Sequence, residues 1–139
     1  MIGINILLGI GLIVITITIH VLLTRLVQFI VQERTSLKQK HINFTKEFQV
    51  ATTVLIIFAA AIVESIVWAA AYLKAGAVQT FTDALYFSIV TFTTLGYGDI
   101  TLNENWRLLA SFQAAIGIII FGWSTAIVVA IVQQIFIKK

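Results

Sequence analysis

The sequence has 139 residues, of which 60% are apolar and only 11% are charged. A soluble domain is about 45–50% apolar and about 25% charged, so this composition excludes a soluble globular enzyme, a disordered segment and a nucleic-acid-binding module. The formal net charge is +3, a small excess that in a membrane protein reports orientation. The absence of cysteine excludes disulfides, zinc sites and thiol catalysis.

Three segments with almost no charge predict three membrane helices. Residues 1–24 and 108–137 carry no formal charge, and residues 48–73 carry one, at Glu64. A membrane helix needs roughly 20 apolar residues, so we predict spans at about 2–26, 48–73 and 106–135. The first segment lacks the basic start of a signal peptide and is longer than its apolar core, so we expect it to remain uncleaved.

Basic residues predict the orientation of these spans. The basic residues between the first two spans are Arg25, Arg34, Lys38, Lys40 and Lys46, against the acidic Glu33 and Glu47. The segment 74–107 instead holds two basic and three acidic residues. The positive-inside rule therefore places the 27–47 loop and the C-terminus in the cytoplasm, and the N-terminus and segment 74–107 outside, in a plasma (inner) membrane protein.

The same basic loop has a second interpretation. Five positive charges close to one leaflet would attract anionic lipid. We favour topology determination alone as the role of the 27–47 loop and keep anionic lipid as a possible partner.

Aromatic residues give a further orientation signal. Trp68, Tyr72 and Trp106 are expected near the outer membrane interface, where amphipathic rings are favoured, whereas Trp123 is expected to pack between helices. His20, inside the first span, is expected to be a hydrogen-bonded helix residue rather than a proton sensor.

The segment between the second and third spans contains a short apolar run from Phe81 to Thr94. Thr80 and Asp83 form a capping pattern at its start, so we predict a half-membrane helix over 81–93. A re-entrant helix is tolerated at membrane depth only where protein or a water-filled cavity surrounds it, which indicates a pore.

The residues after this helix have the properties of an ion filter. A potassium filter replaces the hydration shell of the ion with rings of backbone carbonyls. Gly96 and Gly98 supply the backbone freedom that this requires, and the side chains of Leu95 and Tyr97 must then point away from the pore axis. The C-terminal end of the preceding helix is negative and favours a cation.

The stretch Thr94-Leu95-Gly96-Tyr97-Gly98-Asp99 resembles the pattern Thr-Val-Gly-Tyr-Gly-Asp of the potassium-channel pore domain. The resemblance covers about residues 48–135 and is closest to compact channels with two helices around one pore loop. It implies a homotetramer with K+ held at Thr94, Leu95, Gly96 and Tyr97 and the filter completed by Gly98. Permeant K+ is the only cofactor implied.

The predicted fold class is an all-α membrane protein with three transmembrane helices, a re-entrant pore helix and a filter loop, assembled as a tetramer. Residues 1–47 form an additional helix and basic loop, and residues 48–139 form the pore domain. Within that domain we expect an outer helix at 48–73, a pore helix at 81–93, a filter at 94–98 and an inner helix at 106–135.

Four residues are expected to support the filter: Thr93, Asp99, Glu64 and Val90. Val90 stands where some relatives have a glutamate, so this chain lacks that carboxylate contact. Asp99 either concentrates cations at the pore mouth or braces the filter by a hydrogen bond. Glu64, inside a span, either supports the filter or is a neutral acid between helices; Arg107 and hydroxyls behind the filter are its candidate partners.

The third span has features of an inner helix. By resemblance Gly117 is a hinge, with close helix packing as the alternative. Helical spacing places four residues on one face, which the resemblance assigns to the cavity and gate: Ile118, Phe121, Thr125 and Val129.

We therefore predict a potassium-selective channel subunit and no enzyme activity, because no acid–base pair, nucleophile set or phosphate loop is present. The alternatives are a weakly selective cation channel, which Leu95 in place of valine suggests, and a non-conducting accessory subunit. A potassium-transporter subunit is disfavoured, because the loop has two glycines and occurs in one repeat.

Overall fold

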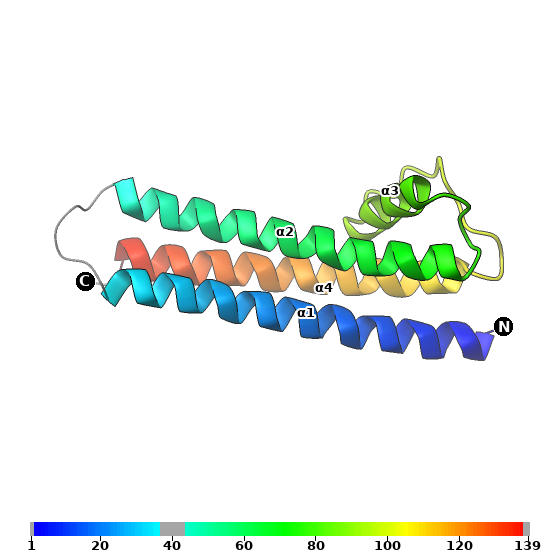
Figure 1. The fold of residues 1–139 in the computed structure, drawn as a ribbon, viewed down its shortest axis with the longest axis horizontal. Helices are drawn as coiled ribbons and strands as arrows, with labels where there is room; N and C mark the ends of the chain where they lie inside the picture. Colours follow the sequence, from blue (N-terminus) through cyan, green and yellow to red (C-terminus); the bar gives the residue numbers. More distant parts are fainter. Residues whose placement is uncertain (1, 37–43, 138–139) are drawn as a thin grey trace.

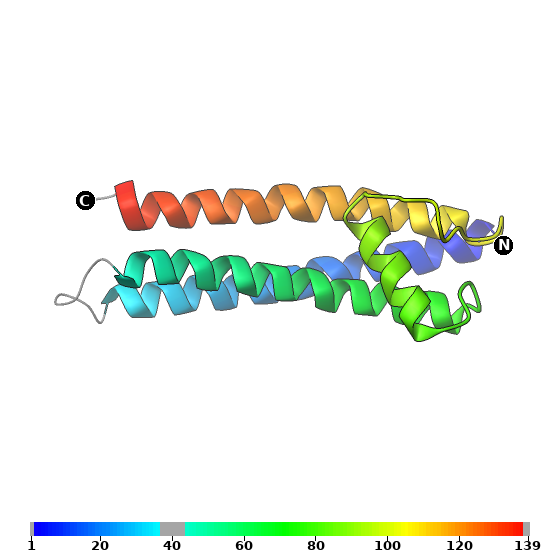
Figure 2. The same cartoon turned by 90° about the horizontal axis from the view of Figure 1, so that it is seen from above.

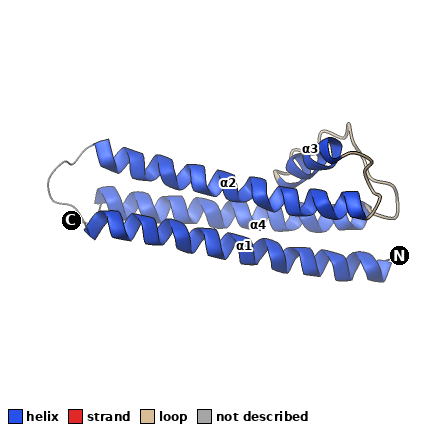
Figure 3. Cartoon of the chain, in the orientation of Figure 1, coloured by secondary structure: helices blue, strands red, loops and turns tan. Residues whose placement is uncertain are grey.

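The computed structural model describes residues 2–36 and 44–137, in which the regular secondary structure is helical and no strand occurs. The elements are α1 (Ile2–Ser36), α2 (Phe44–Lys74), α3 (Phe81–Phe92), α4 (Arg107–Val132) and the π-helix η1 (Gln133–Ile137). The three long helices lie side by side, and α3 sits at one end of the bundle (Figures 1 and 3). The predicted all-α class is confirmed.

Three helices of the described residues are long and apolar enough to cross a membrane, at Ile2–Ile30, Lys46–Lys74 and Arg107–Phe136. The three predicted spans are therefore confirmed, and the chain is an integral membrane protein. Each candidate span has 29 or 30 residues, or about 45 Å at about 1.5 Å per residue. This exceeds the hydrocarbon core, so the helices must tilt or project beyond it.

The helices flanking the predicted basic loop are longer than expected. α1 continues beyond 26 to Ser36, and α2 begins at Phe44 rather than 48. The predicted 27–47 loop is therefore largely helical, and Lys38 and Lys40 lie outside the described residues. The reason is that charged residues end a membrane span without ending a helix, since Glu, Gln and Arg are good helix formers.

The other boundaries differ less from prediction. α3 ends at Phe92, one residue before the predicted end, and α4 begins at Arg107. The predicted inner helix ends inside η1, where the last turns widen from α to π geometry.

The packing places α3 between two of the long helices. α1 packs against α2 and α4, and α3 packs against the same two helices. In the turned view α3 slants across from α2 to α4 at the end that also holds the start of the chain (Figure 2). The largest apolar cluster lies at this end and includes Trp68, Tyr72, Phe92 and Leu109.

The expectation that Trp68 and Tyr72 lie in an interfacial aromatic belt is wrong. Both side chains are fully buried. The Trp68 Nε1–H donates to Thr16 Oγ1 at 2.9 Å, and the Tyr72 hydroxyl donates to Gln113 Oε1 at 2.7 Å. Protein partners on neighbouring helices therefore replace the headgroup region as the polar surroundings of these rings.

Candidate functional site

α3 begins at a side-chain cap, as predicted. Thr80 has an extended backbone, and its Oγ1 accepts a hydrogen bond from the Asp83 backbone N–H at 3.1 Å. The Thr80 hydroxyl also donates to the Asp83 carboxylate at 2.8 Å. This cap sets the start of α3 and therefore the position of its other end, where residues 94–98 follow. These residues are the predicted filter and are called the filter segment below.

The chain folds back onto the end of α3 immediately after Phe92. The Val90 carbonyl accepts from the N–H groups of Leu95 at 3.0 Å and Gly96 at 3.3 Å. The Thr93 hydroxyl donates to the Ile89 carbonyl at 2.8 Å. Val90 and Thr93 therefore contact this segment through backbone and hydroxyl atoms, while the Val90 side chain stays in the apolar interior.

The backbone of the filter segment alternates in handedness. Thr94, Gly96 and Gly98 have φ values of 62°, 56° and 79°, whereas Leu95 and Tyr97 between them have negative φ. Positive φ is uncommon for residues with a Cβ and is a true outlier for a β-branched residue such as Thr94. A segment that alternates in this way loses the up-and-down alternation of carbonyls that characterises a strand. Glycine at two of the three positions removes the steric cost there.

Two large side chains of this segment are uncovered in the single chain. Leu95 is 58% exposed and Tyr97 is 67% exposed. The predicted packing of these side chains behind the filter is therefore not provided by the described part of the same subunit. A groove of about 550 Å³ runs beside the segment and is lined by Phe87 and Thr91 of α3, by Gly96, and by Ala110 and Ala114 of α4.

Asp99 is held to α3 by a residue that the sequence analysis missed. The Tyr86 hydroxyl donates to Asp99 Oδ2 at 2.6 Å, and Asp99 Oδ1 accepts from the Ile100 N–H at 3.1 Å. The hydrogen bond from Tyr86 lowers the pKa of the Asp99 carboxyl, and the same bond raises the pKa of the Tyr86 hydroxyl. Of the two interpretations of Asp99, this geometry fits the bracing one.

A buried hydrogen-bond network lies behind α3 and joins it to α2 and α4. The Ser88 hydroxyl donates to the Ser65 carbonyl at 2.7 Å. The Gln113 Nε2 donates to Ser88 Oγ at 2.7 Å and to the Ser88 carbonyl at 3.2 Å, while Gln113 Oε1 accepts from Tyr72. Isolated polar residues in apolar helices were the available signal for this network.

Removing the Ser88 hydroxyl should destabilise the protein. Ser88→Ala removes the donor from α3 to the Ser65 carbonyl and one of the acceptors of Gln113, so we expect a loss of about 1–3 kcal/mol in unfolding free energy. Denaturant unfolding of the purified protein, followed by tryptophan fluorescence, measures this loss.

The matched control for Ser88→Ala is Ser111→Ala. Ser111 is exposed, and its hydroxyl donates only within its own helix, to the Arg107 carbonyl at 3.2 Å. We expect this variant to stay within about 0.5 kcal/mol of the parent. Equal losses in the two variants would contradict the importance of the network.

Gly117 packs directly against the end of α3. A Cβ placed on Gly117 would overlap the carbonyl oxygen of Phe92 and would lie 3.0 Å from its carbonyl carbon. The Phe92 ring also packs against Phe121, with ring centroids 5.8 Å apart. The close approach of the two backbones therefore requires a glycine at this position, as the packing interpretation of Gly117 expects. The hinge role of Gly117 stays a prediction.

A methyl group at Gly117 should disturb the filter segment as well as the helix. Gly117→Ala must push away the backbone of Phe92, two residues before Thr94, at a cost of about 1–3 kcal/mol. The measurements are unfolding free energy and ion flux in liposomes. Gly122→Ala is the control, because a Cβ there meets nothing within 4 Å in the chain. If the unfolding free energy and the ion flux of Gly117→Ala equal those of the parent, the tight contact is ruled out.

The predicted cavity-lining face of α4 is uncovered in the single chain. Ile118 is 63% exposed, and Phe121, Thr125 and Val129 are also exposed. The Thr125 hydroxyl donates to the carbonyl of Phe121 in its own helix at 2.9 Å. These residues therefore share one open face of the chain.

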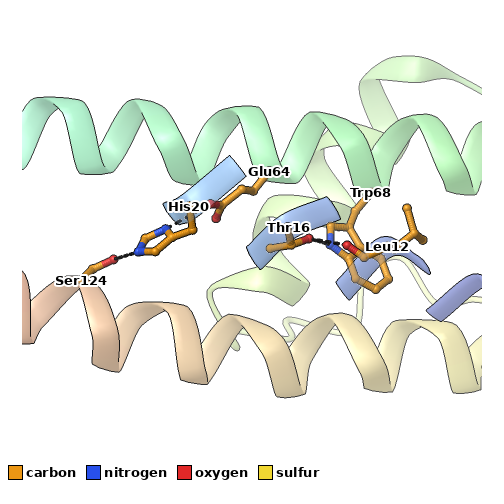
Figure 4. A network of polar contacts seen from close by, with 6 residues as sticks. All are labelled: Leu12, Thr16, His20, Glu64, Trp68 and Ser124. Carbon is orange, nitrogen blue, oxygen red and sulfur yellow. Dashed lines mark hydrogen bonds and ion pairs between the residues drawn. The ribbon is translucent and has the colours of Figure 1, made fainter. Parts of the chain in front are cut away.

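The predicted partners of Glu64 are wrong. Arg107 lies against Glu104 at 3.4 Å, and both of these side chains are exposed. Glu64 is fully buried and instead contacts His20 of α1, with Oε1 and Nδ1 3.1 Å apart (Figure 4). α1 occupies the side of α2 where Glu64 lies, which the sequence alone did not reveal. Filter support by Glu64 remains a prediction, since its described contact is with α1.

Residues 50–134 match a family model described as an ion channel. The match includes most of α2, all of α3, the filter segment and α4, and it leaves out α1. Comparisons with curated proteins and with solved structures give no match for this chain.

Proposed function

Because this chain belongs to the ion channel family, we propose that it is one subunit of a homotetrameric potassium channel that passes K+ passively across the plasma membrane. The observation that carries this proposal is the alternation of positive φ at Thr94, Gly96 and Gly98. The alternation occurs at the residues whose order resembles the potassium-channel filter.

The mechanism follows from what a filter must do. A potassium ion loses its water and is held by backbone carbonyls contributed by Thr94, Leu95, Gly96 and Tyr97 from each subunit. Ions in neighbouring sites repel one another, so entry of one promotes exit of another. The C-terminal end of α3 faces the start of this segment, and its carbonyl ends contribute negative potential that favours a cation.

Assembly is supported by the apolar surfaces that the single chain leaves open. Leu95 and Tyr97 beside the filter, and the face of α4 that includes Ile118 and Val129, are all exposed. One chain supplies one strand of carbonyls, and a ring around an axis needs several copies. In the proposed tetramer these surfaces lie between subunits or line the cavity.

The proposed orientation places the N-terminus outside and the C-terminus in the cytoplasm. The N-terminus and α3 share one end of the bundle, and the C-terminus shares the other end with the start of α2 (Figure 1). At that second end Lys46 lies over the Phe136 ring, 5.6 Å from its centroid. Anionic lipid headgroups at this basic end remain part of the proposal.

Flux through purified protein in liposomes tests the proposed selectivity. We expect flux driven by a K+ gradient that Na+ does not replace. Gly96→Ala should reduce this flux at least about tenfold, because φ of +56° is unfavourable for alanine. The control is Gly3→Ala in α1, where a Cβ meets nothing within 4 Å.

The alternatives give different results in the same assay. Equal flux of K+ and Na+ would support a weakly selective cation channel. Leu95→Val should then restore selectivity, because Leu95 is the residue that departs from the family pattern. Absence of flux with either ion from correctly assembled protein would overturn the proposal in favour of an accessory subunit.

A further inference from the structure

His20 of α1 is enclosed between α2 and α4. Its side chain is 2% exposed. Nδ1 lies 3.1 Å from Oε1 of Glu64, and Nε2 lies 3.4 Å from Oγ of Ser124. Figure 4 shows the imidazole lying between these two groups, so one side chain joins all three long helices.

The Glu64 carboxyl group is incompletely satisfied. Its side chain is fully buried, and Oε2 has no hydrogen-bond partner in the described part of the chain. Among the described contacts, the titratable group facing His20 from α2 is Glu64, while α4 presents the uncharged Ser124 and Trp123. A carboxylate beside a neutral imidazole would leave a net negative charge inside the bundle, which costs several kcal/mol.

One additional proton removes that net charge. The proton can reside on the imidazole, giving an ion pair, or on the carboxyl, giving two neutral groups. In both forms a hydrogen bond joins Nδ1 to Oε1, and Nε2 carries hydrogen and donates to Ser124 Oγ.

We propose that His20 and Glu64 form a proton-binding site that holds one proton between them and, through Ser124, attaches α1 to α4. When that proton leaves, Nδ1–H bonds the carboxylate, and Nε2 becomes an acceptor. The Ser124 hydroxyl must then turn toward His20, and an uncompensated charge remains. The contact between His20 and Ser124 reverses its direction but persists, and the uncompensated buried charge is what weakens the packing of α1 when the proton is lost.

The surroundings provide a route for the proton. The Trp123 ring packs edge-on against His20, with centroids 5.3 Å apart. Trp123 also lines a cavity of about 370 Å³ that continues between α1 and α4 past Gln28 and Gln134. Water in this cavity would approach the pair from the end of the bundle that holds the C-terminus (Figure 1).

The site acts on the half of α4 beyond Gly117. Ser124 adjoins Thr125, which belongs to the face predicted to line the gate. The effect of this proton on conduction therefore rests on the proposed channel function, whereas the proton site itself does not.

The direct test is a nuclear magnetic resonance titration of the His20 imidazole nitrogens in the full-length protein in bilayers. His41→Gln makes His20 the sole histidine. We expect the wild-type spectrum to be that of a pair holding one proton, with Nδ1 hydrogen-bonded to the carboxyl and Nε2 carrying hydrogen, and to change when this proton is lost. In Glu64→Gln the carboxyl that shares the proton is gone, so the pH at which the spectrum changes should differ from that of the wild type. The same pH response in both proteins, or no response in either, overturns the proposal.

Flux measured against pH tests the coupling. We expect flux to change with pH in the wild type and in Thr18→Ala, an exposed α1 variant whose hydroxyl bonds only the Val14 carbonyl. The change should disappear in Glu64→Gln, and in His20→Gln if Glu64→Gln does not fold. Ser124→Ala should keep the imidazole titration but lose the pH dependence of flux. A pH response unaltered by Ser124→Ala overturns coupling through Ser124.

The two readouts separate the two proposals. A normal His20 titration in a protein without flux would contradict the channel function and leave the proton site in place. A conducting protein whose His20 spectrum does not change with pH would contradict the proton site and leave the channel function in place.

Discussion

Gln113 engages both ends of its side-chain amide inside an apolar bundle, and the position of α3 depends on it. Its carbonyl accepts from Tyr72, and its amino group donates to the hydroxyl and carbonyl of Ser88. Water is absent from the bilayer core, so a polar group there must find its partner in protein. The hydrogen bonds of the Gln113 amide therefore hold α3 against α2 and α4. The position of α3 in turn fixes the start of the filter segment.

The same requirement explains how α1 is attached. This helix has mostly apolar residues around its circumference, and lipid would solvate them as well as protein does. Its buried polar residues give it a defined position: Thr16 accepts from Trp68, and His20 reaches Glu64 and Ser124. α1 lies outside the matched family region, yet its contacts involve residues within that region.

Features that depend on neighbouring residues could be predicted from the sequence. The cap at Thr80, the short helix from Phe81 and the glycines needed at 96 and 98 all follow from local patterns. The Ser88–Gln113 and His20–Glu64 contacts could not be predicted. The partners are 25 and 44 residues apart in the sequence, and their contact depends on the register between two helices. The environment of Trp68 was missed for the same reason.

The contact between Gly117 and Phe92 restricts the ways in which α4 can move. Successive residues of an α-helix are about 100° apart around its axis. Turning α4 by one residue would therefore replace Gly117 with the branched side chain of Ile116 or Ile118 against the Phe92 carbonyl. Rotation about the helix axis is blocked at this level, while tilting about the contact is not. The Gly117 contact thus acts as a pivot, and motion of the C-terminal half of α4 can leave the end of α3 in place.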